Sequence, residues 1–431
     1  MATLYLMTDD LRVEDNPALN LAAKADRLAI LYCVDDSLFK TDRFGCRGMG
    51  RQRWRFLRES LQDLNQSLAE LGQVLHLKEG DPVKVMIEIL DKGQFDRVIR
   101  TRVHDARSNG WWHTLAAIFP TIDFVEVDSS TLLERHQVNF ENFPQSFSAF
   151  RKAIADQPFR QPVRAPGSLP ASVELDSRLV TAPSTSELPA GGSLAAGTHL
   201  ENYFNSDAAS TYKETRNALQ GKDYSTGFSS YLANGCVSPV QVHQRLSRYE
   251  HENGRNESTE WILFELLWRD FFRWYGEHHG DRLFEFSGVN GKRPLTSFYR
   301  ERFLKWSTGQ TPWPLVNAAM HELNETGLLS NRARQIVASC LVNELGVDWR
   351  CGASYFAEQL IDYDACSNWG NWQYIAGVGA DPRGGRHFNI EKQTEMFDPD
   401  GSYRSRWSGE PVKAPLDSLD YYDWPVEQQA T

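Results

Sequence analysis

The sequence lacks several short motifs by which common cofactors and metals are bound. Its six cysteines stand singly, with no CxxC pair, at positions 33, 46, 236, 340, 351 and 366. Scattered thiols favour a reducing compartment over disulfides or a zinc site, so no bound metal is expected. The loop TDDLRVEDNP, after the first expected strand, has no glycine, and GxxxxGK[ST] occurs nowhere. These absences disfavour NAD-type and P-loop chemistry.

Long apolar runs and an excess of positive charge are also missing. No run approaches the roughly 20 apolar residues of a membrane helix, and the start, MATL, resembles no secretory signal. We therefore expect a cytoplasmic protein without membrane contact. The net charge is −11, from 46 Lys and Arg against 57 Asp and Glu. Nucleic acid would have to be bound at a local basic patch, because the overall field is not positive.

The chain of 431 residues is long enough for two domains. Short apolar segments typical of buried strands alternate with helical patterns and lie at residues 3–7, 27–34, 74–77, 97–100 and 122–127. One helical pattern, from Trp54 to Leu71, places apolar residues at steps of three and four. Strands that alternate with helices predict an α/β domain with a doubly wound parallel sheet over residues 1–130.

The rest of the chain divides into three parts. Residues 131–197 are interpreted as an interdomain connector, because Pro, Ser, Ala and Gly become frequent from Pro158 to Gly197. Residues 198–407 carry helical patterns without strand candidates, which predicts an all-α domain. Residues 408–431 form an acidic, aromatic tail that we expect to be a docked or mobile terminus.

The stretch from Leu328 to Tyr374 combines a pattern typical of a buried helix with polar residues that ordinary packing does not need. Its apolar residues recur every four positions at Val337, Leu341 and Leu345. Asp364, Asn368 and Trp372 are also four apart, so one helical face could present a carboxylate, an amide and an indole. Trp349 lies upstream. Such a face suits a planar redox cofactor, but a polar helix surface with one core Trp would give the same spacing.

Two further patterns each allow two interpretations. Residues 258–275 are apolar on nearly all sides and predict a central helix with Glu265 in its middle. Glu265 either pairs with Arg269 one turn later or forms the floor of a pocket walled by Trp268. Hydroxyl residues flank Gly227 at the expected start of a helix. They suit a phosphate or act as a simple N-cap.

Four longer blocks carry a family resemblance: YKETRN, ELLWRDFFR, SNRARQIVAS and LIDYDACSNWGNWQYIAGVGADPR. They resemble the photolyase/cryptochrome family, and most closely its DASH cryptochrome branch. The similarity covers nearly the whole chain and is densest from Tyr212 to Trp407. Ser330 and Asn331 replace the paired histidines of the (6-4) photolyases, which disfavours that branch.

The resemblance implies that the all-α domain binds FAD. The positions that match the family's cofactor contacts are Tyr212, Ser225, Thr226, Gly227, Phe228, Ser229, Arg334, Asp362, Asp364 and Asn368. Gly227 stands where this branch usually has Lys, which puts one phosphate or surface contact in doubt. Asn368 matches the residue facing flavin N5, and an amide there is typical of repair-competent members.

The resemblance also assigns residues to chemistry and to DNA. The catalytic positions are Glu265, Trp268, Asn368, Trp372 and Trp349. Trp372 and Trp349 match the inner members of the electron-transfer chain, and Trp306, Trp313 and Tyr299 remain candidates for the outer one. Positions that match DNA contacts are Arg216, Glu265, Trp268, Arg269, Asn331, Arg332, Gln335, Tyr374 and Gln393.

The activity implied is light-driven, FAD-dependent repair of cyclobutane pyrimidine dimers, preferentially in single-stranded DNA. The strand preference is expected because Tyr374 replaces a second Trp of double-strand photolyases, and a single strand avoids the cost of base flipping. A blue-light photoreceptor without repair and a flavin-containing binder of single strands are the alternatives. A monomer is expected, and RNA is an open second partner.

The antenna chromophore is expected to be 5,10-methenyltetrahydrofolate, which the family often holds in the cleft between the domains. Where a Glu often contacts the pterin, this chain has His104 and Asp105. A deazaflavin or no antenna remain open alternatives.

Overall fold

The computed structural model describes residues 1–177, 188–221, 223–381, 383–413 and 415–417. Its parallel sheet has the order β3-β2-β1-β4-β5. The strands are β1 (Ala2–Met7), β2 (Arg27–Asp35), β3 (Leu75–Gly80), β4 (Arg97–Thr101) and β5 (Asp123–Val127), and a short β6 (Ala171–Ser172) pairs with the start of β2. All five predicted strands are confirmed.

Helices cover both faces of the sheet. Alternate residues of each strand point to opposite faces. Leu4 and Leu6 of β1 pack under α3 (Pro82–Leu90) and α4 (Ala106–Ile118). Tyr5 and Met7 pack under α1 (Pro17–Ala22) and α2 (Arg51–Glu70), the helix whose spacing the sequence predicts. The predicted doubly wound sheet is therefore confirmed.

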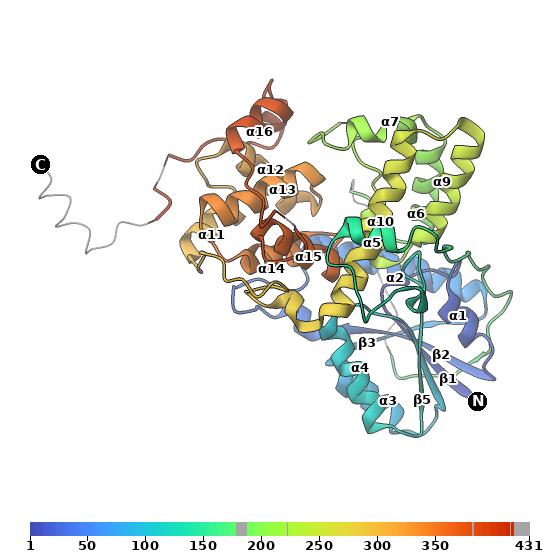
Figure 1. Cartoon of the computed structure of the whole chain (residues 1–431). Coiled ribbons are helices and arrows are strands. Elements are labelled where there is room, and N and C mark those ends of the chain that lie inside the picture. Colours follow the sequence, from blue (N-terminus) through green and yellow to red (C-terminus); the bar gives the residue numbers. More distant parts are fainter. Residues whose placement is uncertain (178–187, 222, 382, 414, 418–431) are drawn as a thin grey trace, which may run out of the picture.

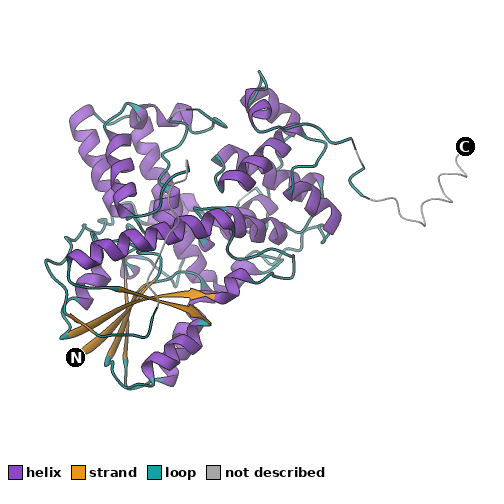
Figure 2. Ribbon diagram, turned by 180° about the vertical axis from the view of Figure 1, so that it is seen from behind, coloured by secondary structure: helices purple, strands orange, loops and turns teal. Residues whose placement is uncertain are grey.

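Helices make up the second half of the chain, which lies above the sheet in Figures 1 and 2. They are α6 (Ser193–Phe204), α7 (Ala208–Thr215), α8 (Ser229–Asn234), α9 (Pro239–Asn253), α10 (Glu257–His279), α11 (Arg300–Ser307), α12 (Pro314–Thr326), α13 (Asn331–Ser339), α14 (Trp349–Gln359), α15 (Ala365–Ala376), α16 (Ile390–Phe397) and α17 (Ser402–Arg406). No strand occurs among the described residues from 198 onward, as predicted.

The expected connector contains some regular structure. It includes α5 (Phe147–Ala153), β6 and the first turns of α6, and residues 178–187 lie outside the described part. Two rings of α5, Phe147 and Phe150, are buried against the helical part of the molecule. The segment therefore adds side chains to the helical core as well as joining the two parts.

The central helix α10 runs through the middle of the molecule (Figure 1). The Asn256 side chain caps its N-terminus by accepting from two backbone N–H groups. Helix α15 packs closely on it at two glycines. A Cβ at Gly276 would lie 2.4 Å from Cys366 Sγ, and one at Gly370 would lie 2.4 Å from Phe272.

The buried pattern after Asn331 forms a helix with one change of geometry. Helix α13 continues into a π-helical turn, η4 (Cys340–Glu344), in which each hydrogen bond spans one more residue. Val337, Leu341 and Leu345 are all fully buried, as the spacing predicts.

Gly352 makes room for the ring of Trp372, and this gives a first prediction. A Cβ at Gly352 would lie 2.1 Å from Cη2 of Trp372. Gly352→Ala should therefore lower the free energy of unfolding by about 1–3 kcal/mol through overpacking. Gly110→Ala on α4 is the matched control, because a Cβ there meets nothing within 4 Å. Equal thermal stability of the two variants would contradict this packing.

Candidate active site

A salt bridge joins α13 to the segment after α14. Arg334 Nη2 lies 2.8 Å from Asp362 Oδ2, and Arg334 Nε donates to the Leu329 carbonyl oxygen. The other carboxylate oxygen, Asp362 Oδ1, is buried without a hydrogen-bond partner among the described residues. A buried acceptor without a hydrogen-bond partner suits a ligand that has an N–H or O–H donor at this point. These residues therefore fit the flavin ring expected beside them.

The second predicted carboxylate, Asp364, has different neighbours. It is the N-cap of α15, and its Oδ1 accepts from the Ser367 backbone N–H at 2.8 Å. Its Oδ2 binds Arg273, which also binds Asp9 at 2.7 Å, so the pKa of Asp364 is held well below its usual range although burial opposes this. These contacts place Asp364 at the junction with the sheet domain.

Asn368 and Trp372 share a face of α15, as their spacing predicts, whereas Asp364 precedes the helix. Both side chains are buried. Asn368 Nδ2 donates to the Ala353 carbonyl oxygen at 3.0 Å, which fixes the orientation of the amide. An amide held in one orientation on a buried face could form a hydrogen bond with the edge of a planar ligand.

The aromatic rings form two separate contacts around these helices. Trp372 meets Trp306 at 6.2 Å between ring centroids, and Trp306 meets Tyr355 at 5.8 Å. Trp349 instead meets Trp369 at 5.7 Å. Of the three candidates for the outer electron donor, Trp306 is therefore the one in contact with Trp372. Tyr299 lies exposed and Trp313 is half-buried at the start of α12.

The loop expected to hold a phosphate precedes α8, so the hydroxyl residues lie at the start of a helix, as predicted. The interpretation of these residues as a simple N-cap is wrong, because the N-cap of α8 is Phe228 and no side chain caps the helix. Gly227 has a φ of +67°, and a Cβ there would lie 2.7 Å from Nε2 of His199. A lysine at this position would be strained in this chain. The hydroxyl residues Ser225 and Ser229 are exposed, with Thr226 half-buried between them.

Two of the predicted cofactor contacts are more deeply buried than this loop. The Phe228 ring packs into the core against Tyr203 and Phe204, so its side chain has a structural role. Tyr212 on α7 is buried, and burial together with the charge of Glu265 raises the pKa of its phenol.

Glu265 on α10 is bound by two donors from its surroundings. Its Oε1 accepts from Arg216 Nη2 at 2.5 Å and from Trp261 Nε1 at 3.0 Å. Burial raises the pKa of Glu265, and both donors oppose that shift. The interpretation that pairs Glu265 with Arg269 is wrong, because Arg269 donates to two backbone carbonyl oxygens, of Ser130 and Leu232. Arg269 is thus turned towards the domain junction.

Trp268 has four aromatic neighbours, two of which, Phe271 and Phe272, belong to its own helix. The ring of Phe147, from the connector, stacks on it with centroids 3.8 Å apart. Tyr374 meets it edge-on at 6.2 Å. The Tyr374 hydroxyl accepts from Arg386, whose guanidinium also lies over the phenol ring. Phe147 and Arg386 are members of this group that the sequence patterns did not indicate.

The remaining predicted DNA contacts gather at the start of α13 and on α16. Arg332 donates to Gln335 at 3.0 Å and to Asn217 at 2.9 Å, and Asn331 is exposed. Gln393 has a buried amide oxygen without a partner among the described residues. Arg332 also lies over the ring of Phe397, 4.8 Å from its centroid, so the start of α13 lies beside α16.

Glu322 on α12 gives a prediction of pH dependence. It accepts a hydrogen bond from Tyr403, and burial raises its pKa to about 7 from an ordinary 4.5, while Tyr403, Arg406 and Arg334 oppose the shift. Its raised pKa means that the stability it contributes is present below pH 4.5 and is lost as the pH rises through 7.

The variant Glu322→Gln should therefore gain stability relative to the wild type between pH 5 and pH 8, by about 3 kcal/mol at most. Thermal unfolding at both pH values measures this difference. A difference in Tm between the two proteins that does not change with pH would contradict a titrating Glu322.

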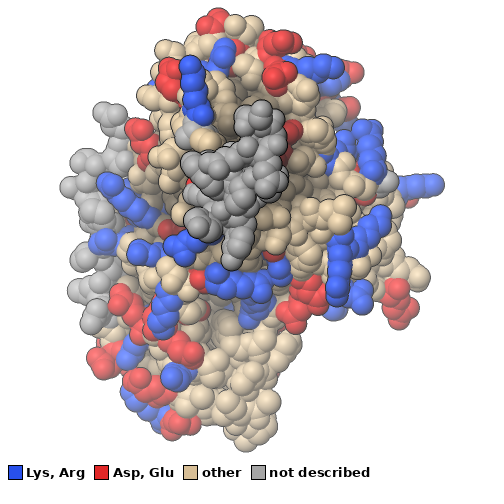
Figure 3. All heavy atoms as spheres, turned by 90° about the vertical axis from the view of Figure 1, so that its left-hand side faces the viewer, with Lys and Arg blue, Asp and Glu red and all other residues tan. Residues whose placement is uncertain are grey.

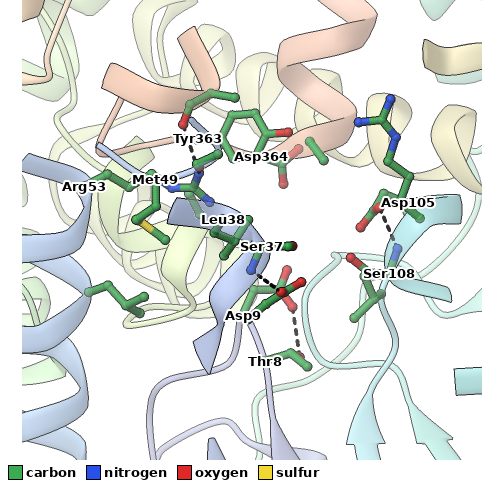
Figure 4. A pocket seen from close by; sticks show the side chains of 18 of the residues that line it. Thr8, Asp9, Ser37, Leu38, Met49, Arg53, Asp105, Ser108, Tyr363 and Asp364 are labelled. Atoms are coloured by element: carbon green, nitrogen blue, oxygen red, sulfur yellow. Dashed lines mark hydrogen bonds between the residues drawn. The ribbon is translucent and has the colours of Figure 1, made fainter. Parts of the chain in front are cut away.

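A separate cavity of about 620 Å³ lies between the sheet and the helical part. Its floor is built at the carboxyl ends of β1, β2 and β4, where ligands of parallel sheets bind. Figure 4 shows Asp105 and Ser108 on one side, Tyr363 and Asp364 on another, and Thr8, Asp9 and Ser37 below. Asp105 caps α4 by accepting from Ser108 N at 3.0 Å.

His104 also lines this cavity and holds the two parts together. It is buried, and its Nδ1 lies 3.0 Å from Oε2 of Glu277 on α10. Arg107, Trp111 and Trp369 add a cation and two rings to the wall. The cavity therefore combines planar apolar surfaces with both signs of charge.

Two features are absent from the residues that the structure describes. No group of three or more His, Cys, Asp or Glu side chains there could hold a metal ion. No helix in that part of the chain is long and apolar enough to cross a membrane.

Comparison with known proteins identifies the family. A family model described as "DNA photolyase" matches residues 3–167, and one described as "FAD binding domain of DNA photolyase" matches residues 261–431. The protein "Cryptochrome DASH" of Idiomarina loihiensis is 46% identical, over 98% of this chain and 96% of its own length.

Two solved structures are similar in fold. The Synechocystis cryptochrome superposes with a TM-score of 0.90 at 36% identity, covering 99% of this chain and 94% of that one. The archaeal photolyase of Sulfolobus tokodaii, described with two FAD molecules, gives 0.77 at 25% identity, covering 96% and 92%. The chain therefore belongs to the DASH cryptochrome branch of the photolyase/cryptochrome family, whose helical domain binds FAD.

Proposed function

We propose that this protein is a light-driven, FAD-dependent lyase that repairs cyclobutane pyrimidine dimers, preferentially in single-stranded DNA. The observation that carries the proposal is the group around Trp268: an edge-on Tyr374, and one turn away a carboxylate bound by Arg216 and Trp261. Aromatic walls with a few oriented polar groups are what a flipped-out base pair requires.

Each residue of this group has a task in the proposed reaction. FAD, when bound and reduced, supplies one electron to the dimer under light and takes it back, so no net redox change occurs. Glu265 would donate a hydrogen bond from its protonated carboxyl group to the dimer and so stabilise the negative charge that the electron adds. Trp268 and Tyr374 position the two bases. Asn368, whose amide donates to the Ala353 carbonyl oxygen, would face the edge of the bound flavin.

Basic and polar residues around the group at Trp268 would bind the DNA backbone. Arg216 and Arg332 provide the charges, Asn331 and Gln335 add hydrogen-bonding groups on α13, and Gln393 adds one on α16. Arg269 is not proposed as a DNA contact, because its guanidinium already donates to the carbonyl oxygens of Ser130 and Leu232. Because the net charge is −11, binding should depend on this patch and weaken with salt.

We also propose that the cavity between the domains holds an antenna chromophore, with 5,10-methenyltetrahydrofolate as the first candidate. Planar walls and mixed charges suit a pterin with its acidic tail. A second flavin is the alternative, since the S. tokodaii structure is described with two FAD molecules.

The variant Asp105→Asn tests the antenna. Asparagine is as good an N-cap as aspartate, so α4 should stay intact while the charge is lost. The absorbance of any second chromophore in the purified protein should fall, with the FAD content unchanged. Unchanged occupancy of the cavity would remove Asp105 from the contact.

The alternative function is a blue-light photoreceptor with little or no repair. Illumination of the reduced protein with a dimer-containing oligonucleotide, against a dark control, separates the two. Recovery of the bases only under light supports the lyase, and a light-dependent change in partner binding without recovery supports the photoreceptor.

A further inference from the structure

An exposed apolar patch lies around the start of α11. Four of the nine large hydrophobic side chains that are exposed in the described part of the chain lie within ten residues of one another there, Leu295, Phe298, Tyr299 and Leu304. Exposed apolar clusters of this kind mark interaction surfaces. A cavity of about 200 Å³ opens beside them, lined by the rings of Phe44, Phe303 and Tyr355 among others. It is smaller than the pockets of about 300–1,000 Å³ that hold drug-sized ligands, and suits single side chains.

The rim of this patch is basic. Arg43 and Arg300 line the small cavity and are exposed, and neither has a hydrogen bond or ion pair among the described residues. Figure 3, which faces the side of the molecule that carries α11, shows Lys and Arg side chains gathered near its middle. An occupant of the patch should therefore be both apolar and acidic.

The last described residues of the chain run towards this patch. Lys305 Nζ donates to the carbonyl oxygens of Pro415 and Leu416, and Arg302, one turn earlier on α11, binds the Asp417 carboxylate. The chain thus passes along α11 against the direction of the helix. Arg302 also lies over the Tyr299 ring, 4.5 Å from its centroid. Asp417 is therefore held beside the patch.

The sequence that follows has the chemistry the patch requires. Residues 418–424 read SLDYYDW, with two Asp among one Leu, two Tyr and one Trp. Seven extended residues reach at most roughly 23–25 Å, which is enough to cover the patch from Asp417. We propose that residues 418–424 dock on the apolar patch, with Asp420 and Asp423 facing Arg300 and Arg43.

The patch lies at the outer end of a series of aromatic contacts. Phe298 meets Phe303 at 6.3 Å and Phe303 meets Trp306 at 6.1 Å between ring centroids, and Trp306 meets Trp372. The docking proposed here does not rest on the proposed function.

The test compares two truncations of the full chain in the dark. Removal of residues 418–431 deletes the docking segment but keeps Asp417, and removal of 425–431 keeps the segment. Hydroxyl-radical footprinting should show Phe298 and Tyr299 modified several-fold faster in the first variant than in the second or in the full chain. Equal rates in all three proteins would overturn the proposal.

Two further measurements separate docking within one chain from an effect of truncation and from contacts between copies. The full-length variant Arg300→Glu should expose the same two rings without any truncation, since the charge facing Asp420 or Asp423 is reversed. Protection that increases with protein concentration would overturn docking within one chain and assign the patch to contacts between copies. Protection independent of concentration and weakened by salt is the expected result.

Discussion

Replacing Glu265 by alanine is expected to leave FAD bound and to lower the rate of light-driven dimer repair by roughly 10²–10³-fold, the usual cost of losing one charge-stabilising group. The carboxylate lies on α10, one turn before Trp268, and is oriented by Arg216 and Trp261. Its loss removes a hydrogen-bond partner of the dimer and also frees Arg216. Flavin absorbance of the purified variant and single-turnover repair under light measure the two quantities.

Glu265→Gln is the matched control for this experiment. It keeps an acceptor oxygen for Trp261 and Arg216 and replaces the other carboxylate oxygen by an N–H donor, so its repair rate should fall between the wild type and the alanine variant. Repair by Glu265→Ala at the wild-type rate would exclude Glu265 from the reaction and leave it a structural partner of Arg216.

The second large effect is expected at Trp372. Trp372→Phe should nearly abolish photoreduction of FAD, because phenylalanine is not readily oxidised, while chemically reduced protein should repair at close to the wild-type rate. The ring is fully buried, so the substitution should also cost about 1–3 kcal/mol of stability. Flavin absorbance under illumination with an added donor follows the reduction.

The two ring contacts make this experiment more specific. Trp306 lies next to Trp372, whereas Trp349 lies next to Trp369. Trp306→Phe should slow photoreduction if electrons arrive through the first contact, and Trp349→Phe if they arrive through the second. Photoreduction that is unchanged in Trp372→Phe would exclude the first route and leave the contact of Trp349 with Trp369 as the one to test.

Local patterns predicted most of the fold. All five strands and the central helix α10 follow from the pattern of apolar residues, which in each case lies within one short stretch. The family resemblance rested on long contiguous blocks, and it is confirmed by relatives over nearly the whole chain. Signals of this kind need no knowledge of which segments meet in space.

Contacts between distant segments could not be predicted. Glu265 binds Arg216, 49 positions earlier, and not Arg269 one turn away. Asp364 matches the spacing of Asn368, but its capping of α15 and its salt bridge to Arg273 turn it towards the other domain. Phe147, from a segment rich in loops, stacks on Trp268. In each case tertiary packing selected a partner that the local spacing does not encode.

The measurement that tests the central claim most directly compares repair in two substrates. The reduced protein is illuminated with the same dimer in a single strand and in a duplex, alongside the variant Tyr374→Trp, and recovery of thymine absorbance is followed. The account predicts recovery mainly in the single strand. The variant should repair the duplex faster than the wild type does, because a second stacking ring offsets part of the few kcal/mol that base flipping costs. No recovery in either substrate, with FAD bound and reduced, would contradict the account.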